Sequence, residues 1–234
     1  MLTPEDWKYH ELQWESPKIS TLKFIEFISD NVDEGCTVLD LGTGAGAALN
    51  FIAGRFPSAK FVGVDREINL IEFARSRNRL ENCSYVVGDI TNVSNICDPV
   101  EGIISLQTLS WLSGYEEALS NAINVFSPSW IAVSSLFYDG EIESLSQITE
   151  FNSGRTSSYN TYSIPKLDRW LRSVGWEVTS KLVFNLNQEI DKPLDSDTMS
   201  TYSVRSTQGE EFQISGPLLM NWYYLMLTPI SKED

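Results

Sequence analysis

The sequence predicts an α/β fold in which a doubly wound, mostly parallel sheet carries helices on both faces. Short apolar segments alternate with segments of helical spacing along most of the 234 residues. Strands that alternate with helices form parallel sheets through right-handed crossovers. A glycine-rich turn follows the first strand, and acidic residues end the next two strands. With 42% hydrophobic residues, the chain can bury a substantial core, so we expect a single domain over residues 1–234.

The expected elements follow one another in a regular order. Apolar residues at helical spacing from Leu22 to Ile28 predict a helix before the first strand. Residues 1–36 would then form an N-terminal helical cover, and residues 37–137 the ligand-binding core. We expect strands over residues 37–41, 60–65, 84–89, 100–106, 130–137, 176–184 and 221–228, and helices over residues 22–28, 47–55, 67–80, 114–126 and 164–175.

Two insertions interrupt this alternation. Residues 138–163 are polar and include Gly140 and Gly154; a connection of this length is typical of a lid over a site. Residues 185–216 begin as an irregular loop. They end in two alternating segments on either side of a polar turn, which predicts a β-hairpin.

The glycine-rich turn, residues 42–46, predicts a ligand site. Gly42, Gly44 and Gly46 follow a strand and precede a helix. Glycine lets a ligand lie directly on the backbone, and the helix N-terminus offers free N–H groups. Asp40 stands two residues before the turn, so an uncharged or cationic ligand suits it better than a phosphate. A dinucleotide-binding turn reads G-x-G-x-x-G, whose last position here is Ala47; since alanine is allowed there, spacing alone does not decide between cofactors.

Two further carboxylates end the next strands. Asp65 ends the second strand, where an acid of a doubly wound sheet accepts hydrogen bonds from both ribose hydroxyls. The alternative is a surface acid, which this register makes the weaker interpretation. Asp89 ends the third strand, where it can accept from an adenine amino group while Ile90 packs on the ring. Its alternative role is a helix N-cap.

Charge and cysteine content exclude several classes of partner. The net charge is −15, from 17 basic and 32 acidic side chains, which repels nucleic acids and anionic membranes. Cys36, Cys83 and Cys97 lack metal-ligand spacing and are expected to be buried thiols, and with one histidine no metal site is expected. No apolar run suits a membrane span or a secretory signal, so we expect a cytoplasmic protein.

Four segments in register resemble the class I S-adenosylmethionine-dependent methyltransferases. They are VLDLGTGAGA, FVGVD, VVGDI and ISLQTLSWL, and they fall between Val38 and Ser135. The resemblance implies a Rossmann-like, seven-stranded sheet whose last strand is antiparallel, and NWYYLML near the end of the chain resembles that strand.

The resemblance also implies S-adenosyl-L-methionine as cofactor and a role for each matched residue. Gly42 and Gly44 would approach its methionine part, Asp65 the ribose, and Asp89 with Ile90 the adenine. Leu106 and Gln107 would lie beside the transferable methyl group. The full set of expected cofactor contacts is Gln13, Trp14, Asp40, Gly42, Thr43, Gly44, Asp65, Arg66, Asp89, Ile90, Leu106 and Gln107.

A narrower resemblance bears on the acceptor. YHELQWESPK and SGPLLMNWYYL resemble methyltransferases of bacterial surface-polysaccharide and small-metabolite pathways. The acceptor implied is a small polar metabolite, such as a sugar or amino-alcohol phosphate, methylated on oxygen or nitrogen. Many relatives carry a histidine before the aromatic residue after the fourth strand, where this chain has Ser110 before Trp111. The expected acceptor contacts are Trp111, Arg155, Tyr159 and Tyr162.

The group that takes the acceptor's proton has several candidates. His10 is the side chain whose unperturbed pKa lies near neutrality, and in relatives the segment that carries it folds across the pocket. His10 or Tyr9 could serve as the base, and Tyr138 in the lid is a third candidate. In the alternative, Trp7, His10 and Trp14 share one helical face and simply anchor a helix.

Two other functions remain open at the level of sequence. A nicotinamide-dependent oxidoreductase would use the same sheet and Asp65, although the glycine spacing and Asp40 count against it. A cofactor-binding subunit without chemistry would keep the same motifs. A homodimer is one option for the assembly.

Overall fold

The computed structural model describes residues 4–92, 99–149, 154, 156–184, 200–205, 211–216 and 221–230. Cys97 and Arg155 therefore lie outside the described residues. The helices are α1 (Pro4–Glu15), α2 (Ile19–Ile28), α3 (Ala47–Arg55), α4 (Ile68–Arg77), α5 (Glu116–Phe126) and α6 (Ile164–Ser173), with 3-10 turns η1 (Ser29–Asn31) and η2 (Leu109–Trp111). The strands are β1 (Thr37–Leu41), β2 (Lys60–Asp65), β3 (Cys83–Val87), β4 (Gly102–Leu106), β5 (Trp130–Tyr138), β6 (Gln147–Thr149), β7 (Thr156–Ser158), β8 (Tyr162–Ser163), β9 (Trp176–Phe184), β10 (Ser200–Arg205), β11 (Glu211–Gly216) and β12 (Asn221–Pro229).

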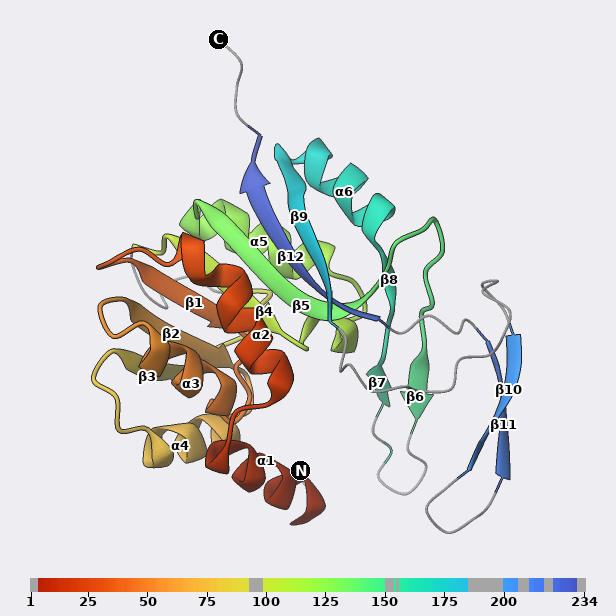
Figure 1. Cartoon of the computed structure of the whole chain (residues 1–234), viewed down its shortest axis with the longest axis horizontal. Coiled ribbons are helices and arrows are strands. Elements are labelled where there is room, and N and C mark those ends of the chain that lie inside the picture. Colours follow the sequence, from red (N-terminus) through yellow and green to blue (C-terminus); the bar gives the residue numbers. More distant parts are fainter. Residues whose placement is uncertain are drawn as a thin grey trace.

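The main sheet confirms the predicted fold class. Its strands lie in the order β3-β2-β1-β4-β5-β12-β9, and β8 adds a short pairing to β5. Strands β1 to β5 pair in parallel, whereas β12 is antiparallel to both β5 and β9. Strand order reverses beside β1, which places a ligand crevice at the carboxyl ends of β1 and β4. Figure 1 shows this sheet running through the middle of the molecule.

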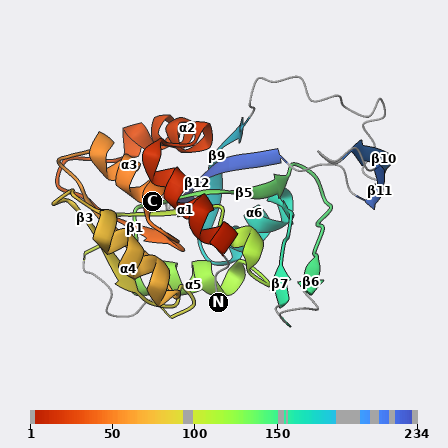
Figure 2. The ribbon, with the colours of Figure 1, turned by 90° about the horizontal axis from the view of Figure 1, so that it is seen from below.

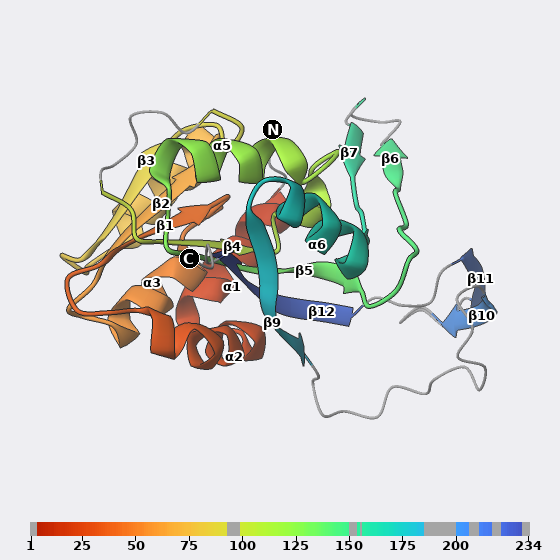
Figure 3. The same ribbon diagram turned by 90° about the horizontal axis from the view of Figure 1, so that it is seen from above.

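Helices cover both faces of the sheet. One core cluster includes Leu119 of α5 and Leu167 of α6, and the other includes Phe24 of α2 and Ile52 of α3. Figures 2 and 3 show α2 and α3 on one side of the sheet and α5 on the other. Strand β1 contributes side chains to both clusters: Val38 packs with α2 and α3, and Leu39 packs on the opposite face of the sheet. The continuous apolar strands of the sequence are therefore explained by burial on two faces.

Several element boundaries differ from the expected ones for local reasons. β3 ends at Val87 rather than at Asp89, because Asp89 forms an isolated bridge with Asn92 and accepts a hydrogen bond from the Thr91 N–H. The helix expected from Leu22 starts three residues earlier, at Ile19. The predicted hairpin is present as antiparallel β10 and β11.

The insertion over residues 138–163 contains short strands and fixed contacts. β6 and β7 form a two-stranded ribbon, and Ser144 bridges Thr161. Asn160 is 3% exposed; its amide nitrogen donates to the Leu112 carbonyl at 2.7 Å, and its amide oxygen accepts from the Ser146 N–H. The base of this insertion is thus tied to the turn that follows β4.

No helix within the described ranges is long and apolar enough to cross a membrane.

Candidate functional site

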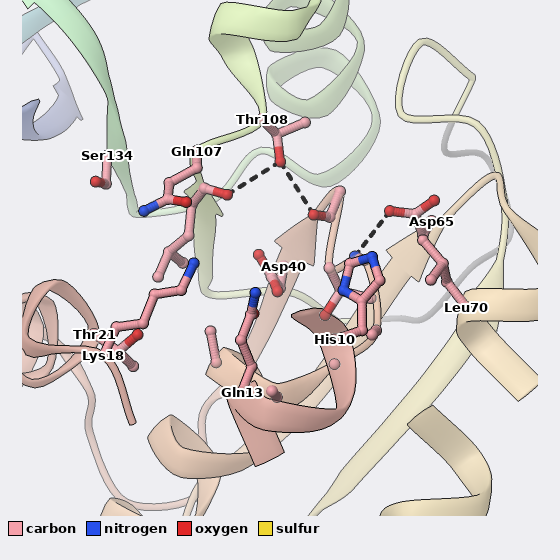
Figure 4. A pocket seen from close by; sticks show the side chains of 18 of the residues that line it. His10, Gln13, Lys18, Thr21, Asp40, Asp65, Leu70, Gln107, Thr108 and Ser134 are labelled. Carbon is pink, nitrogen blue, oxygen red and sulfur yellow. Dashed lines mark hydrogen bonds between the residues drawn. The ribbon is translucent and has the colours of Figure 1, made fainter. Parts of the chain in front are cut away.

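A cavity of about 660 Å³ opens at the carboxyl ends of β1, β2 and β4 and beside the middle of β5. Its wall is built from the glycine turn, from α1, from the start of α2, and from the residues that follow β4 (Figure 4). This is the place where doubly wound sheets bind ligands, and the volume suits a nucleoside-sized molecule together with a small partner.

The three glycines of the turn are required for different structural reasons. Gly42 has φ +78°, and a Cβ there would come within 2.4 Å of the Thr108 side chain. Gly46 has φ +79°, and a Cβ there would meet the ring of Tyr85 at 2.5 Å. Gly44 also has a positive φ, yet a Cβ there would meet nothing within 4 Å. Gly42 and Gly46 therefore fit the turn to the protein, while Gly44 leaves bare backbone at the cavity.

Asp65 links the glycine turn to β2. Its Oδ2 accepts a hydrogen bond from the Gly44 N–H at 2.8 Å (Figure 4). Its Oδ1 accepts from the Glu67 N–H at 2.9 Å. A carboxylate offers about four acceptor positions. Asp65 thus fixes the loop and keeps capacity for two further donors on the cavity side.

Asp40 is a buried acid in the wall of the cavity. It is 2% exposed, and burial raises its pKa to about 7, opposed by the Thr43 hydroxyl beside it and aided by the charge of Asp65. Within the described part of the chain, Asp40 Oδ1 and Thr43 Oγ1 lack hydrogen-bond partners. A buried acceptor without a donor costs free energy, which a cationic or hydrogen-bonding ligand would recover.

Helix α1 closes one side of the cavity. The Trp14 indole N–H donates to the Ala45 carbonyl at 2.9 Å, and the Trp7 ring packs edge-on against Phe73 of α4. With these two tryptophans docked, His10 and Gln13 line the cavity. Figure 4 places His10 on the side of Asp65 and Leu70, with Gln107 and Ser134 on the opposite side.

The segment after β4 holds a strained backbone beside the cavity. Gln107 has φ +62°, in the left-handed region that non-glycine residues rarely adopt. Its N–H donates to the Ser134 carbonyl at 2.6 Å. The next side chain, Thr108, donates to the Gly42 carbonyl at 3.0 Å, and this contact joins the turn after β4 to the glycine turn. Residues held in such conformations concentrate at functional sites.

An aromatic pair stands beside the cavity. Trp111 lines the cavity, is 50% exposed, and lies with its ring 4.8 Å from the Tyr159 ring between centroids. Ser110, in contrast, is fully buried: its hydroxyl bonds with Ser135 Oγ and accepts from the Leu136 N–H. Ser110 therefore fixes the turn to β5 and does not face the cavity.

The cavity brings together a large part of the predicted site. The predicted residues that line it are His10, Gln13, Asp40, Gly42, Thr43, Gly44, Asp65, Arg66, Leu106, Gln107 and Trp111. Tyr159 reaches this group through its contact with Trp111.

Other predicted residues lie elsewhere. Trp14 docks α1 without lining the cavity. Asp89 is exposed and its pKa is lowered by the hydrogen bonds from Thr91, while Ile90 is buried in the core. The adenine contacts of Asp89 and Ile90 therefore stay a prediction.

Two of the candidate tyrosines, Tyr138 and Tyr162, do not line the cavity. Tyr162 is 2% exposed, and its hydroxyl donates to the Leu112 carbonyl, so the structure gives it a packing role in the core. Tyr138 ends β5 and lies against Gly140. The side chain of Tyr9 lies outside the described residues, as does Arg155.

Several lining residues escaped the sequence analysis. Lys18 and Thr21 come from the start of α2, and Ser134 from the middle of β5. The Ser16-Pro17 break between two helical segments was a usable signal for Lys18 and Thr21, because it marks the N-terminus of the helix that precedes the first strand. Ser134 had none, since its strand reads as uniformly buried. Across the described residues, no group of three His, Cys, Asp or Glu side chains could hold a metal ion.

Comparison with known proteins agrees with this geometry. A family model described as a methyltransferase domain matches residues 32–175, which is more than half of the chain. Trans-aconitate 2-methyltransferase of Variovorax paradoxus is 28% identical over 98 residues, 42% of this chain and 37% of that protein. Malonyl-[acyl-carrier protein] O-methyltransferase of Priestia megaterium is 26% identical over 108 residues, 46% of this chain and 39% of that protein.

Among solved structures, a SAM dependent methyltransferase from Aquifex aeolicus superposes with a TM-score of 0.58 at 16% identity, over 98% of this chain and 100% of that one. This likeness supports the fold. The matched segments span less than half the length of the two curated relatives. From the family match, which includes the glycine turn, the chain belongs to the methyltransferase domain family.

Proposed function

We propose that this protein transfers a methyl group from S-adenosyl-L-methionine to a small polar molecule. The observation that carries the proposal is a single cavity lined by the glycine turn, Asp65 and Gln107 in a chain of the methyltransferase domain family.

The residues present fit that cofactor. The open backbone at Gly44 accepts close approach, and Asp65 has acceptor capacity for two ribose hydroxyls. The unpartnered Asp40 Oδ1 and Thr43 Oγ1 suit the ammonium group of the methionine part. Asp40 would then hold a cation that favours its ionised form, which offsets the burial that raises its pKa.

The cofactor brings an activated sulfonium methyl group, so the chain's own residues mainly align and enclose the reactants. Asp65 and the glycine turn would fix the nucleoside, and Gln107 would lie beside the reacting centre. Helix α1, docked by Trp14, would exclude water from one side. A general base is needed only where the acceptor must lose a proton. The candidates for that base are His10, Tyr9 and Tyr138, and the position of His10 on the side of Asp65, away from Gln107, favours a contact with the cofactor over this role.

For the acceptor we propose a small polar metabolite. Relatives are named for trans-aconitate and for malonyl-acyl carrier protein, and a sugar or amino-alcohol phosphate is our narrower proposal. Trp111 and Tyr159 would form one wall of its entrance, with Arg155 a further proposed contact. A cytoplasmic location and a homodimer remain proposals of the same kind.

The test is an assay with methyl-labelled S-adenosylmethionine and a fractionated metabolite extract. We expect label to move into a small molecule while S-adenosylhomocysteine accumulates. Tight cofactor binding without transfer to any fraction would favour a non-catalytic subunit, and tight NAD binding without S-adenosylhomocysteine binding would favour an oxidoreductase.

A further inference from the structure

The end of the cavity farthest from Asp65 is rich in hydrogen-bond donors. Lys18, Gln107 and Ser134 line it, from the start of α2, the end of β4 and β5 respectively. In Figure 4, the Lys18 side chain extends into the cavity toward Gln107, and Ser134 lies beyond Gln107. Three donors from three elements thus face one volume.

Lys18 is exceptional in an acidic protein. Among the described residues that line the cavity, Lys18 and Arg66 are the only lysine and arginine, in a chain of net charge −15. The Arg66 side chain is 78% exposed and lies 3.9 Å from Glu67 at the other end of the cavity. Asp40 and Asp65 repel an anion in their part of the cavity, whereas Lys18 attracts one at the opposite end.

The backbone that carries Lys18 is held in place. The Tyr224 hydroxyl donates to the Ser20 carbonyl at 2.6 Å, and Tyr224 is 1% exposed. The Lys18 carbonyl accepts from the Leu22 N–H at the first turn of α2. A lysine on a fixed helix start is a preorganised cation, and the helix dipole there has the same sign.

Gln107 and Ser134 supply independent signs of a ligand at the same place. Gln107 carries backbone strain that a packing role does not require, because glycine would adopt φ +62° more easily. Ser134 is 3% exposed. Among the residues drawn in Figure 4, neither the Ser134 hydroxyl nor the Gln107 carboxamide makes a hydrogen bond. Among the residues drawn, both groups are therefore open to oxygen atoms of a ligand.

We propose that Lys18, Gln107 and Ser134 form a subsite for an oxyanion of the acceptor, a carboxylate or a phosphate ester. That the bound anion belongs to the acceptor rests on the proposed function. That the subsite binds an anion rests on the three residues described above. It narrows the substrate class to small anionic metabolites and excludes neutral sugars and free amines. The strained Gln107 would then be retained for the donor that its carboxamide provides.

The experiment uses the full chain with and without saturating S-adenosylhomocysteine. Malonate and inorganic phosphate are titrated by calorimetry, with malonamide as the uncharged probe. The variants are Lys18→Met and Gln107→Gly, and the matched control is Lys23→Met on the same helix, whose Nζ pairs with Glu26 at 3.0 Å outside the cavity.

We expect at least one anion to bind the wild type, at least tenfold more weakly to Lys18→Met, and unchanged to Lys23→Met. Gln107→Gly should also bind the anion more weakly. Its midpoint of denaturant unfolding should be no lower than that of the wild type, because glycine adopts the positive φ more easily. The tighter anion identifies the source: malonate indicates a carboxylic acid acceptor, and phosphate a phosphate ester.

Equal anion binding by Lys18→Met and wild type overturns the proposal, and so does binding of malonamide as tight as that of malonate. A further arm compares S-adenosylhomocysteine with methylthioadenosine, which lacks the amino-acid part. If Lys18→Met weakens only the former, Lys18 holds the cofactor's carboxylate and the acceptor subsite is refuted. Failure of the wild type to bind S-adenosylhomocysteine would instead contradict the proposed function, because anion binding is also measured without it.

Discussion

At the scale of single residues, Asp65 has a structural role and a proposed binding role. It holds the Gly44 and Glu67 N–H groups, and on our proposal it also accepts two ribose hydroxyls. We predict that Asp65→Ala weakens S-adenosylhomocysteine binding by at least tenfold, since each hydrogen bond to a charged group contributes about 1.5–3 kcal/mol. Calorimetry measures this, with the exposed Asp30→Ala in η1 as control. Unchanged affinity in a folded Asp65→Ala protein would refute the ribose assignment.

Asp40 predicts a pH dependence of stability in the ligand-free protein. Burial raises its pKa from 3.8 to about 7, so the folded state binds this proton more tightly than the unfolded state. Its contribution is therefore full below about pH 4 and is lost as pH rises toward 7, by up to about tenfold in the folding equilibrium per pH unit.

Asp40→Asn should remove this loss. Denaturant unfolding at several pH values should find the variant gaining stability relative to wild type as pH rises through that window. A difference that stays constant with pH would contradict the assigned environment of Asp40.

His10 is predicted to act on binding more than on turnover. It lines the cavity on the side of Asp65, away from Gln107 and Ser134 (Figure 4). His10→Asn should weaken S-adenosylhomocysteine binding roughly threefold to tenfold, the value of one net hydrogen bond, with turnover near wild type at saturating substrates. The exposed Lys8→Ala on the same helix is the control. A large fall in turnover with intact binding would identify His10 as the base instead.

At the scale of elements, the insertion after β5 is anchored at its base. Asn160 bonds the Leu112 carbonyl, the Ser146 N–H and the Tyr162 hydroxyl. Asn160→Ala leaves the Ser146 N–H without its partner and removes one donor from the Leu112 carbonyl and from the Tyr162 hydroxyl, which keep their bond to each other. We therefore predict a loss of about 1–3 kcal/mol of unfolding free energy. Urea titration measures it, and Leu145→Ala, at a site 62% exposed in the same segment, should change stability little. A loss below about 0.5 kcal/mol for Asn160→Ala would mean that the insertion is not coupled to the core.

The elements also explain how far sequence reasoning reached. β1, β2, α3 and β9 match their expected residues because their apolar runs end at turn residues or acids that break them. Tyr162 is an expected acceptor contact because it lies in the insertion expected to cover the site and offers a polar group. Its hydroxyl donates to the Leu112 carbonyl, which lies 50 residues away, and no local pattern encodes such a contact.

At the scale of the whole molecule, the cavity joins segments that are distant in sequence. The glycine turn and Asp65 were predictable because the doubly wound sheet brings them to one edge. Lys18 had only the Ser16-Pro17 break as a signal and Ser134 had none, since their place in the cavity depends on how α2 packs against β12 and on which face of β5 meets the cavity. The proposed cofactor half of the site could therefore be predicted from motifs, whereas the proposed acceptor half required the fold.

The central claim is that this cavity binds S-adenosylmethionine, and one calorimetric experiment tests it most directly. The wild-type chain is titrated with S-adenosylhomocysteine and, separately, with NAD. We predict one S-adenosylhomocysteine per chain, with affinity reduced at least tenfold in Asp65→Ala, and no NAD binding. NAD binding without S-adenosylhomocysteine binding, or binding that Asp65→Ala leaves unchanged, would contradict the account.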